Sequence, residues 1–341
     1  MVKVTTLKDV AKLAGVSVAT VSRVVNGHKA VADETRARVE DAVRKLNYNP
    51  NSIARSLVTG RTDAILLYIV QEDPIVPTTW SYELPIIQGI SDFLRGKSWE
   101  LQIIMCSNRE FQEPGFVNDK LDRRNVDGIL VISAWTVERH VVSELKKRQI
   151  PYILVGCNDP DGKSPSFEYD NAAATKALVK HLRGLGHTTF GLIGGANDQL
   201  HMQDRLRGFE EALESSGLPL WNRLIKQGNW AVESGYSCMK ELLSESPQPT
   251  AIVCGNDHIA VGAMQAIRES GAEVPRDYAV VGFDDTIVAQ VATPKLTTVR
   301  APLQEMGTMA VKALHRALTK PESWTPPKVV LPCEIVLRES T

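Results

Sequence analysis

The N-terminal stretch TLKDVAKLAGVSVATVSRVVNG, residues 6–27, decides the fold of the first part of the chain. Apolar residues recur in it with the i, i+3, i+4, i+7 spacing of one helix face, at Leu7, Val10, Ala11 and Ala14. Gly15 then ends this first helix, and Ser17 is placed to cap a second one. Small residues at the contact, a flexible glycine at the turn and a branched residue after it are typical of a helix-turn-helix.

The second helix is expected to bury Val21, Val24 and Val25, and a third apolar face follows at Val39, Ala42, Val43 and Leu46. The outward residues of the second helix are then Val18, Ala19, Thr20 and Arg23. The first turns of such a helix lie in the major groove of DNA. We expect Arg23 to contact guanine and the small Val18 and Ala19 to meet thymine methyl groups. Phosphate oxygens are the expected partners of Ser17, Thr20 and Asn26.

Charge is distributed unevenly along the chain, and this favours the same interpretation. Residues 1–60 hold ten Lys and Arg against five Asp and Glu, whereas the other 281 residues hold 29 against 35. The net charge of −1 therefore combines a basic head, residues 1–60, with a mildly acidic body, the other 281 residues. We expect only the head to meet a polyanion.

The segment NPNSIARSLVTGRT, residues 49–62, predicts a short helix that connects the head to the body. Pro50 suits the first turn of a helix, and Gly60 suits its end. A helix of two turns is not stable alone and should order only against a partner. Leu57 is a candidate wedge for the DNA minor groove, and Ala54 is a further candidate contact. From these residues alone, a plain interdomain linker is the favoured alternative.

The remainder predicts an α/β fold. Apolar runs such as AILLYIV, GILVIS, FGLIGG and AIVCG alternate with helical patterns, which indicates two doubly wound parallel-sheet lobes at about 62–163 and 164–292, with C-terminal crossovers. Ligands bind beyond the carboxyl ends of such strands. The candidate ligand-binding residues are Arg205, Trp230, Asn256, Asp284 and, after the first strand, Tyr82. Asp257 is expected to cap the helix that starts near Ile259.

Other classes of protein find little support in the sequence. No apolar run is long enough to span a bilayer, and the first residues lack the apolar core of a secretory signal. Five scattered cysteines favour reduced thiols, and so a cytoplasmic protein without a zinc site. No phosphate loop, dinucleotide fingerprint, HExxH or GxSxG motif is present. We therefore expect a protein that is not an enzyme and that has no cofactor, catalytic residue or metal site.

The motifs together resemble the lactose/galactose repressor family of bacterial transcription regulators. The stretches that carry the resemblance are residues 6–27, NYNPNSIARSL, DNAAATKALVKHLRGLGHTTFGLIGG, TAIVCGNDHIAVGAMQAIRESGAEVPRDYAVVGFDD and TPKLTTVRAPLQEMG. The resemblance implies that Val18, Ala19 and Arg23 read bases and that Leu57 is the minor-groove lever at a central CG step. It also implies that Arg205, Trp230, Asn256 and Asp284 line an effector cleft.

These observations combine into one hypothesis. We expect a helix-turn-helix domain at 1–49, a hinge helix or linker at 50–61 and an effector-binding and dimerisation core, similar to periplasmic binding proteins, at 62–341. The chain should act as a homodimeric repressor on a pseudopalindromic DNA operator, controlled by a small ligand such as a sugar or sugar derivative. Control by a protein corepressor, as in the catabolite-control branch, and control by a purine remain alternatives. A periplasmic binding protein is disfavoured by the basic head.

Overall fold

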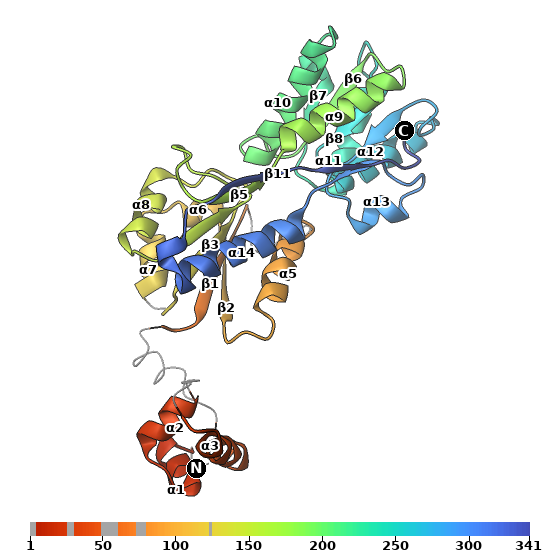
Figure 1. The fold of residues 1–341 in the computed structure, drawn as a ribbon. Coiled ribbons are helices and arrows are strands. Elements are labelled where there is room, and N and C mark those ends of the chain that lie inside the picture. The colour runs from red at the N-terminus through yellow and green to blue at the C-terminus, as the bar shows by residue number, and fades with distance from the viewer. Residues whose placement is uncertain (1–4, 26–30, 49–60, 73–79, 123–124) are drawn as a thin grey trace. The chain divides into compact units, whose positions relative to one another are not determined.

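The computed structural model describes residues 5–25, 31–48, 61–72, 80–122 and 125–341. The chain divides into two compact units, Met1–Thr62 and Asp63–Thr341 (Figure 1). Asn26, Ala54 and Leu57 lie outside the described residues. None of the described helices combines the length and the apolar character needed to cross a membrane.

The first unit contains the predicted helix-turn-helix and a third helix. Its helices are α1 (Leu7–Ala14), α2 (Val18–Val25) and α3 (Asp33–Lys45). Gly15 adopts a left-handed φ of 66° at the end of α1, which glycine tolerates without strain. Arg38 of α3 donates hydrogen bonds to the carbonyl oxygens of Ala14 (2.6 Å) and Gly15 (3.2 Å). The third helix therefore stabilises the turn by packing and by charge-assisted hydrogen bonds.

The second unit begins with a six-stranded parallel sheet in the order β11-β5-β4-β3-β1-β2. Its strands are β1 (Ala64–Gln71), β2 (Glu100–Ser107), β3 (Gly128–Ile132), β4 (Tyr152–Val155), β5 (Ser166–Tyr169) and β11 (Lys328–Leu331). The central strands are buried on both faces, which explains their unbroken apolar sequences. We call this sheet and its helices the first lobe.

A four-stranded parallel sheet in the order β7-β6-β8-β9 forms the second lobe. Its strands are β6 (Phe190–Gly194), β7 (Ile225–Gln227), β8 (Ala251–Cys254) and β9 (Ala279–Val281). Two further strands, β10 (Thr298–Arg300) and β12 (Glu334–Val336), pair with each other in antiparallel fashion. The predicted doubly wound α/β architecture is confirmed in both lobes.

Helices cover both sheets (Figure 1). Those of the first lobe are α5 (Glu83–Leu94), α6 (Asn108–Phe111), α7 (Phe116–Asp122), α8 (Arg139–Lys147) and α14 (Leu303–Thr319), with a 3-10 turn at Pro321–Ser323. Those of the second lobe are α9 (Asn171–Gly184), α10 (Leu200–Ser215), α11 (Val232–Leu243), α12 (Asp257–Glu269) and α13 (Ile287–Val291), with a 3-10 turn at Asn222–Leu224. Helices α5 and α14 lie side by side although they are far apart in sequence, and Thr308 donates to the Gly89 carbonyl oxygen at 3.2 Å.

The predicted boundary between the lobes at residues 163 and 164 is wrong by several residues. Strand β5 pairs with β4 of the first sheet, so the chain leaves the first lobe only after Tyr169. It returns with α14 and with β11, which pairs with β5, and then leaves again for β12. The C-terminal segment is therefore part of the first lobe's fold as well as a crossover.

A second correction concerns the start of α12. The helix is capped by Asn256, whose Oδ1 accepts from the Ile259 amide at 2.8 Å, and not by Asp257. Asp257 is instead fully buried, and its carboxylate accepts from the amide and hydroxyl of Thr286 (2.7 and 2.9 Å) and from the hydroxyl of Thr298. This carboxylate therefore ties α12 to the loop before α13 and to β10. Burial raises the pKa of Asp257 to about 7, although these hydrogen bonds oppose the shift.

This raised pKa predicts a pH-dependent stability. In the unfolded chain the pKa of Asp257 is about 3.9. The folded protein therefore holds the proton more tightly, and the resulting stabilisation declines as the pH rises from about 4 through about 7. Over that pH range, the free energy of unfolding of the wild type should fall relative to that of Asp257→Asn. The expected fall is about 1.4 kcal/mol for each pH unit between the unfolded and the folded pKa of Asp257.

Urea unfolding at a series of pH values measures this difference. Asp119→Asn, which changes an exposed carboxylate, is the matched control and should show no such trend. A difference between wild type and Asp257→Asn that stays constant with pH would contradict the prediction.

Candidate functional site

The exposed face of α2 is the first candidate site. Val18 is 41% exposed, and Ala19 and Arg23 are also exposed, whereas Val21 and Val24 are buried against the other helices. The predicted division of α2 into an inner and an outer face is therefore confirmed for these residues, whereas Thr20 and Val25 are both half-buried. The outer face presents two small apolar side chains and one guanidinium within a single turn and a half, which is a surface suited to base edges.

Ser17 caps α2 as its sequence position predicted. Its hydroxyl oxygen accepts from the Thr20 amide at 3.0 Å and lies 2.9 Å from the Thr20 hydroxyl. This hydrogen bonding positions the exposed first turn of the helix. The assignment of Ser17 and Thr20 to phosphate contacts remains a prediction.

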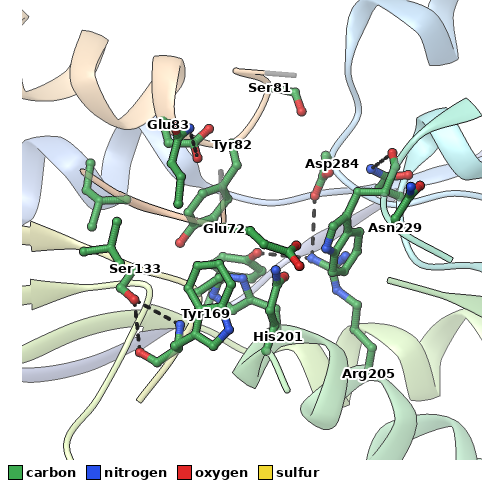
Figure 2. A pocket seen from close by; sticks show the side chains of 18 residues that line it. Glu72, Ser81, Tyr82, Glu83, Ser133, Tyr169, His201, Arg205, Asn229 and Asp284 are labelled. Atoms are coloured by element: carbon green, nitrogen blue, oxygen red, sulfur yellow. Dashed lines mark hydrogen bonds and ion pairs between the residues drawn. The ribbon is translucent and has the colours of Figure 1, made fainter. Parts of the chain in front are cut away.

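The second candidate site is a cavity of about 330 Å³ in the second unit. It lies between the two lobes and is lined by residues at the carboxyl ends of their parallel strands, as expected for open α/β sheets. The first lobe supplies Val70, Gln71, Glu72, Ser81, Tyr82, Glu83, Ile132, Ser133, Ala134, Trp135 and Tyr169. The second lobe supplies Gln199, His201, Arg205, Asn229, Trp230, Asn256 and Asp284. Figure 2 shows these side chains converging on the cavity from both lobes.

All five residues that the sequence analysis selected for ligand binding line this cavity. They come from five separate segments, namely the start of α5, helix α10, the loop after β7, the end of β8 and the loop after β9. The structure therefore brings together Tyr82, Arg205, Trp230, Asn256 and Asp284. Contact of each with a ligand remains a prediction.

Arg205 occupies the centre of the hydrogen-bond network around the cavity. Only 4% of this residue is exposed, and its guanidinium donates to Asn171 Oδ1 at 2.9 Å, to the Tyr169 hydroxyl at 3.2 Å and to the Gly255 carbonyl oxygen. It also lies 3.6 Å from a carboxylate oxygen of Asp284. Burial raises the pKa of Asp284, and the charge of Arg205 opposes that shift.

The Trp230 indole faces the cavity and packs against glycine residues. A Cβ atom at Gly195 would lie 2.0 Å from the indole, so glycine is required there for the ring to fit. Asn256 donates its side-chain amide to the Trp230 carbonyl oxygen at 3.1 Å. The indole Nε1 is buried and has no hydrogen-bond partner among the described residues. A flat ring with one free donor is suited to a polar ligand that has an apolar face.

Tyr82 and His201 pack together on the side of the cavity formed by the first lobe and α10. Their ring centres are 5.1 Å apart, and His201 Nε2 lies 2.8 Å from the Gly156 carbonyl oxygen. A Cβ at Gly156 would lie 1.7 Å from the Tyr82 hydroxyl, so this position also requires glycine. Burial and the nearby Arg205 lower the pKa of His201 to about 3, which keeps the imidazole neutral.

The backbone is strained at two of the cavity residues. Trp230 has a φ of 69° and Asp284 a φ of 102°, both in the region that side chains other than glycine rarely adopt. Strain of this kind persists only where surrounding contacts over-determine the conformation, and it is concentrated at functional sites. The two side chains are thus held in position at a cost in conformational free energy.

Sequence reasoning missed several residues of the cavity. Gln71 is the last residue of β1 and Trp135 follows β3, so the strand-end rule that selected Asp284 would also have selected them. Tyr169 was missed because the short strand SFEY carries a polar residue and gives no strong apolar run. Glu83 is the first residue of α5, where an acidic side chain is common for reasons of helix stability alone.

Comparison with known proteins finds similar proteins for both units of the chain. The chain matches the bacterial regulatory proteins of the lacI family over residues 6–51 and the periplasmic binding protein-like domain over residues 179–341. It is 32% identical over 337 residues to catabolite control protein A of Priestia megaterium, covering 98% of this chain and 99% of that protein.

Two solved structures are similar over nearly the full length. The lac repressor dimer bound to operator and the anti-inducer ONPF is 28% identical, with a TM-score of 0.84 and 99% of each chain covered. The complex of the transcriptional regulator CelR with cellobiose is 30% identical, with a TM-score of 0.73, covering 99% of this chain and all of that one. This chain therefore belongs to the lacI family of bacterial regulatory proteins and is a DNA-binding transcription regulator.

Proposed function

We propose that this regulator is an allosteric repressor whose DNA affinity is set by a carbohydrate bound between the two lobes. The observation that carries the proposal is the cavity itself, where Arg205, Asp284 and Trp230 meet side chains of the opposite lobe. Carboxylate, amide and guanidinium groups suit vicinal hydroxyls, and the indole offers a flat apolar face to a sugar ring. The similar CelR protein is in complex with cellobiose, which supports this ligand class.

The repressor is proposed to act as a homodimer. Strand β2 is the edge of the first sheet, and two of its apolar side chains, Ile103 and Met105, are 43% and 40% exposed. In the second lobe, α13 exposes Ile287 and Val291 at 67% and 69%. Exposed apolar patches of this kind mark protein interfaces, and a two-fold dimer would match a pseudopalindromic operator.

Ligand binding is proposed to change the arrangement of the lobes, because both lobes contribute to one cavity. A ligand that touches both lobes favours the arrangement in which all its contacts form at once. To move the protein from about 1% to about 99% of one state, the ligand must prefer that state by about 5.5 kcal/mol. The contacts that the ligand makes with both lobes at once are the proposed source of this preference.

At the DNA end, Arg23 is proposed to read a base. Replacing it with alanine should weaken binding to the operator by about tenfold or more per half-site, the effect of about 1–3 kcal/mol for one bidentate contact. Binding to random duplex should fall only a few-fold, because there the variant loses only the attraction of one positive charge to the DNA phosphates. The operator is first selected from a random duplex pool, and affinities are then measured by fluorescence anisotropy at fixed salt.

Arg44→Ala provides the matched control, because it removes an exposed arginine from α3 and not from α2. It should affect both duplexes equally. Equal losses on operator and random duplex for Arg23→Ala would show that Arg23 reads no base.

At the ligand end, Trp230 is the residue with the most direct test. Trp230→Ala should leave operator affinity within about twofold, because the cavity belongs to a different unit from α2. It should lower the affinity for the carbohydrate that controls DNA binding by at least about tenfold, because the stacking of the indole on the sugar ring is lost. A panel of mono- and disaccharides in a DNA-binding assay measures this response.

Trp221→Ala, which removes an exposed tryptophan outside the cavity, is the control and should respond like the wild type. A full response from Trp230→Ala would show that the effector binds elsewhere. Hypoxanthine and guanine are included in the panel, and a response to them in place of any carbohydrate would favour the purine alternative.

A further inference from the structure

Two acceptor atoms on the first-lobe side of the cavity have no donor among the described residues. Gln71 donates its side-chain amide to Glu83 Oε1 at 3.2 Å, which holds the two side chains together. The remaining oxygens, Gln71 Oε1 and Glu83 Oε2, are buried and have no hydrogen-bond partner among the described residues. Figure 2 shows Glu83 beside Tyr82 at the start of α5. Buried acceptors without a donor are rare in proteins, so a ligand donor at this position would satisfy both oxygens.

The Glu83 carboxylate also lacks a counter-charge. Within the described residues, no ion pair involves Glu83 or its neighbour in the cavity, Glu72. Arg205 lies 3.6 Å from Asp284 and is already matched by it, and His201 is neutral. The cavity lining therefore carries more negative than positive charge. Burial raises the pKa of Glu83, in keeping with a carboxylate that has no cation beside it.

We propose that the ligand carries a protonated amine seated against Glu83 and Gln71, and that the effector is therefore an amino sugar with a free amino group. This inference rests on the proposed carbohydrate control of the same cavity and specifies the ligand's chemical class. An ammonium group has three donors, which matches two adjacent acceptor oxygens with one donor to spare. It also supplies the charge that a buried carboxylate needs, which a neutral hydroxyl does not.

Two further buried polar groups of the cavity suit the hydroxyl groups of such a ligand. The Tyr82 hydroxyl and Trp230 Nε1 are buried and have no partner among the described residues. Both are donors, and they suit the hydroxyl or ring oxygens of a sugar. A sugar acid or sugar phosphate would instead bring its negative charge to a cavity that holds Glu72, Glu83 and Asp284, with Arg205 already paired. The cavity therefore discriminates against anionic ligands by electrostatic repulsion.

Sets of sugars that differ only in one substituent test the inference. Isothermal titration calorimetry on the full-length protein compares D-glucosamine with D-glucose, N-acetyl-D-glucosamine and D-glucuronate. The same comparison is made for the corresponding galacto and manno sugars. At the disaccharide level, the chitosan dimer is compared with cellobiose and diacetylchitobiose. At least one free amine should bind about tenfold or more tighter than its neutral, acetylated and acidic counterparts. Glu83→Gln should remove this preference.

Glu100→Gln is the matched control, because it neutralises an exposed carboxylate of the first lobe that does not line the cavity. Its effect on the amine should be less than about threefold, since solvent screens an exposed charge. An unchanged melting temperature and operator affinity of Glu83→Gln show that the variant is folded. Neutral or acidic sugars that bind as tightly as the amines, or an amine preference that survives Glu83→Gln, overturn this inference alone. If no carbohydrate of any charge binds, the proposed carbohydrate control falls with it.

Discussion

The buried guanidinium of Arg205 is the interaction on which the ligand-binding body depends. A charge with 4% exposure is tolerated only if it is paired and its donors are satisfied. Its partners come from both lobes, namely the Tyr169 hydroxyl at the end of β5 and Asp284 after β9. Removing either partner would leave a buried charge less well compensated. The relative position of the two lobes therefore determines whether the buried Arg205 charge keeps its partners.

Much of this arrangement follows from sequence patterns that act locally. The apolar spacing of α1 and α2 and the glycine between them specify a helix-turn-helix, because period and turn chemistry are properties of a few neighbouring residues. Buried parallel strands give unbroken apolar runs, and chain topology places their carboxyl ends at one edge. Trp230, Asn256 and Asp284 were therefore identifiable as cavity residues before their contacts were known.

What the sequence did not reveal depends on contacts between distant segments. The hydrogen bonds from Arg38 to the α1–α2 turn and from Gln71 to Glu83 have no local signature, because each joins residues from separate elements. Residues 166–169, which form β5, fell on the wrong side of the predicted lobe boundary because their pairing with β4 and β11 is a property of the sheet. Asn256 caps α12 in place of Asp257 because Asp257 is drawn into bonds with Thr286 and Thr298.

The distribution of satisfied and unsatisfied groups suggests how a ligand acts on the lobes. On one side of the cavity the lobes already hold each other, through Trp135 to Asp198 at 2.9 Å, Leu200 to Ala134 at 2.8 Å and His201 to Gly156. The acceptors of Gln71 and Glu83 and the Trp230 donor have no partners among the described residues. A ligand that satisfies all three groups spans the lobes, and its binding free energy then depends on their separation. We therefore propose that ligand sensing depends on the part of the interface whose polar groups lack partners, while the hydrogen-bonded part holds the two lobes together.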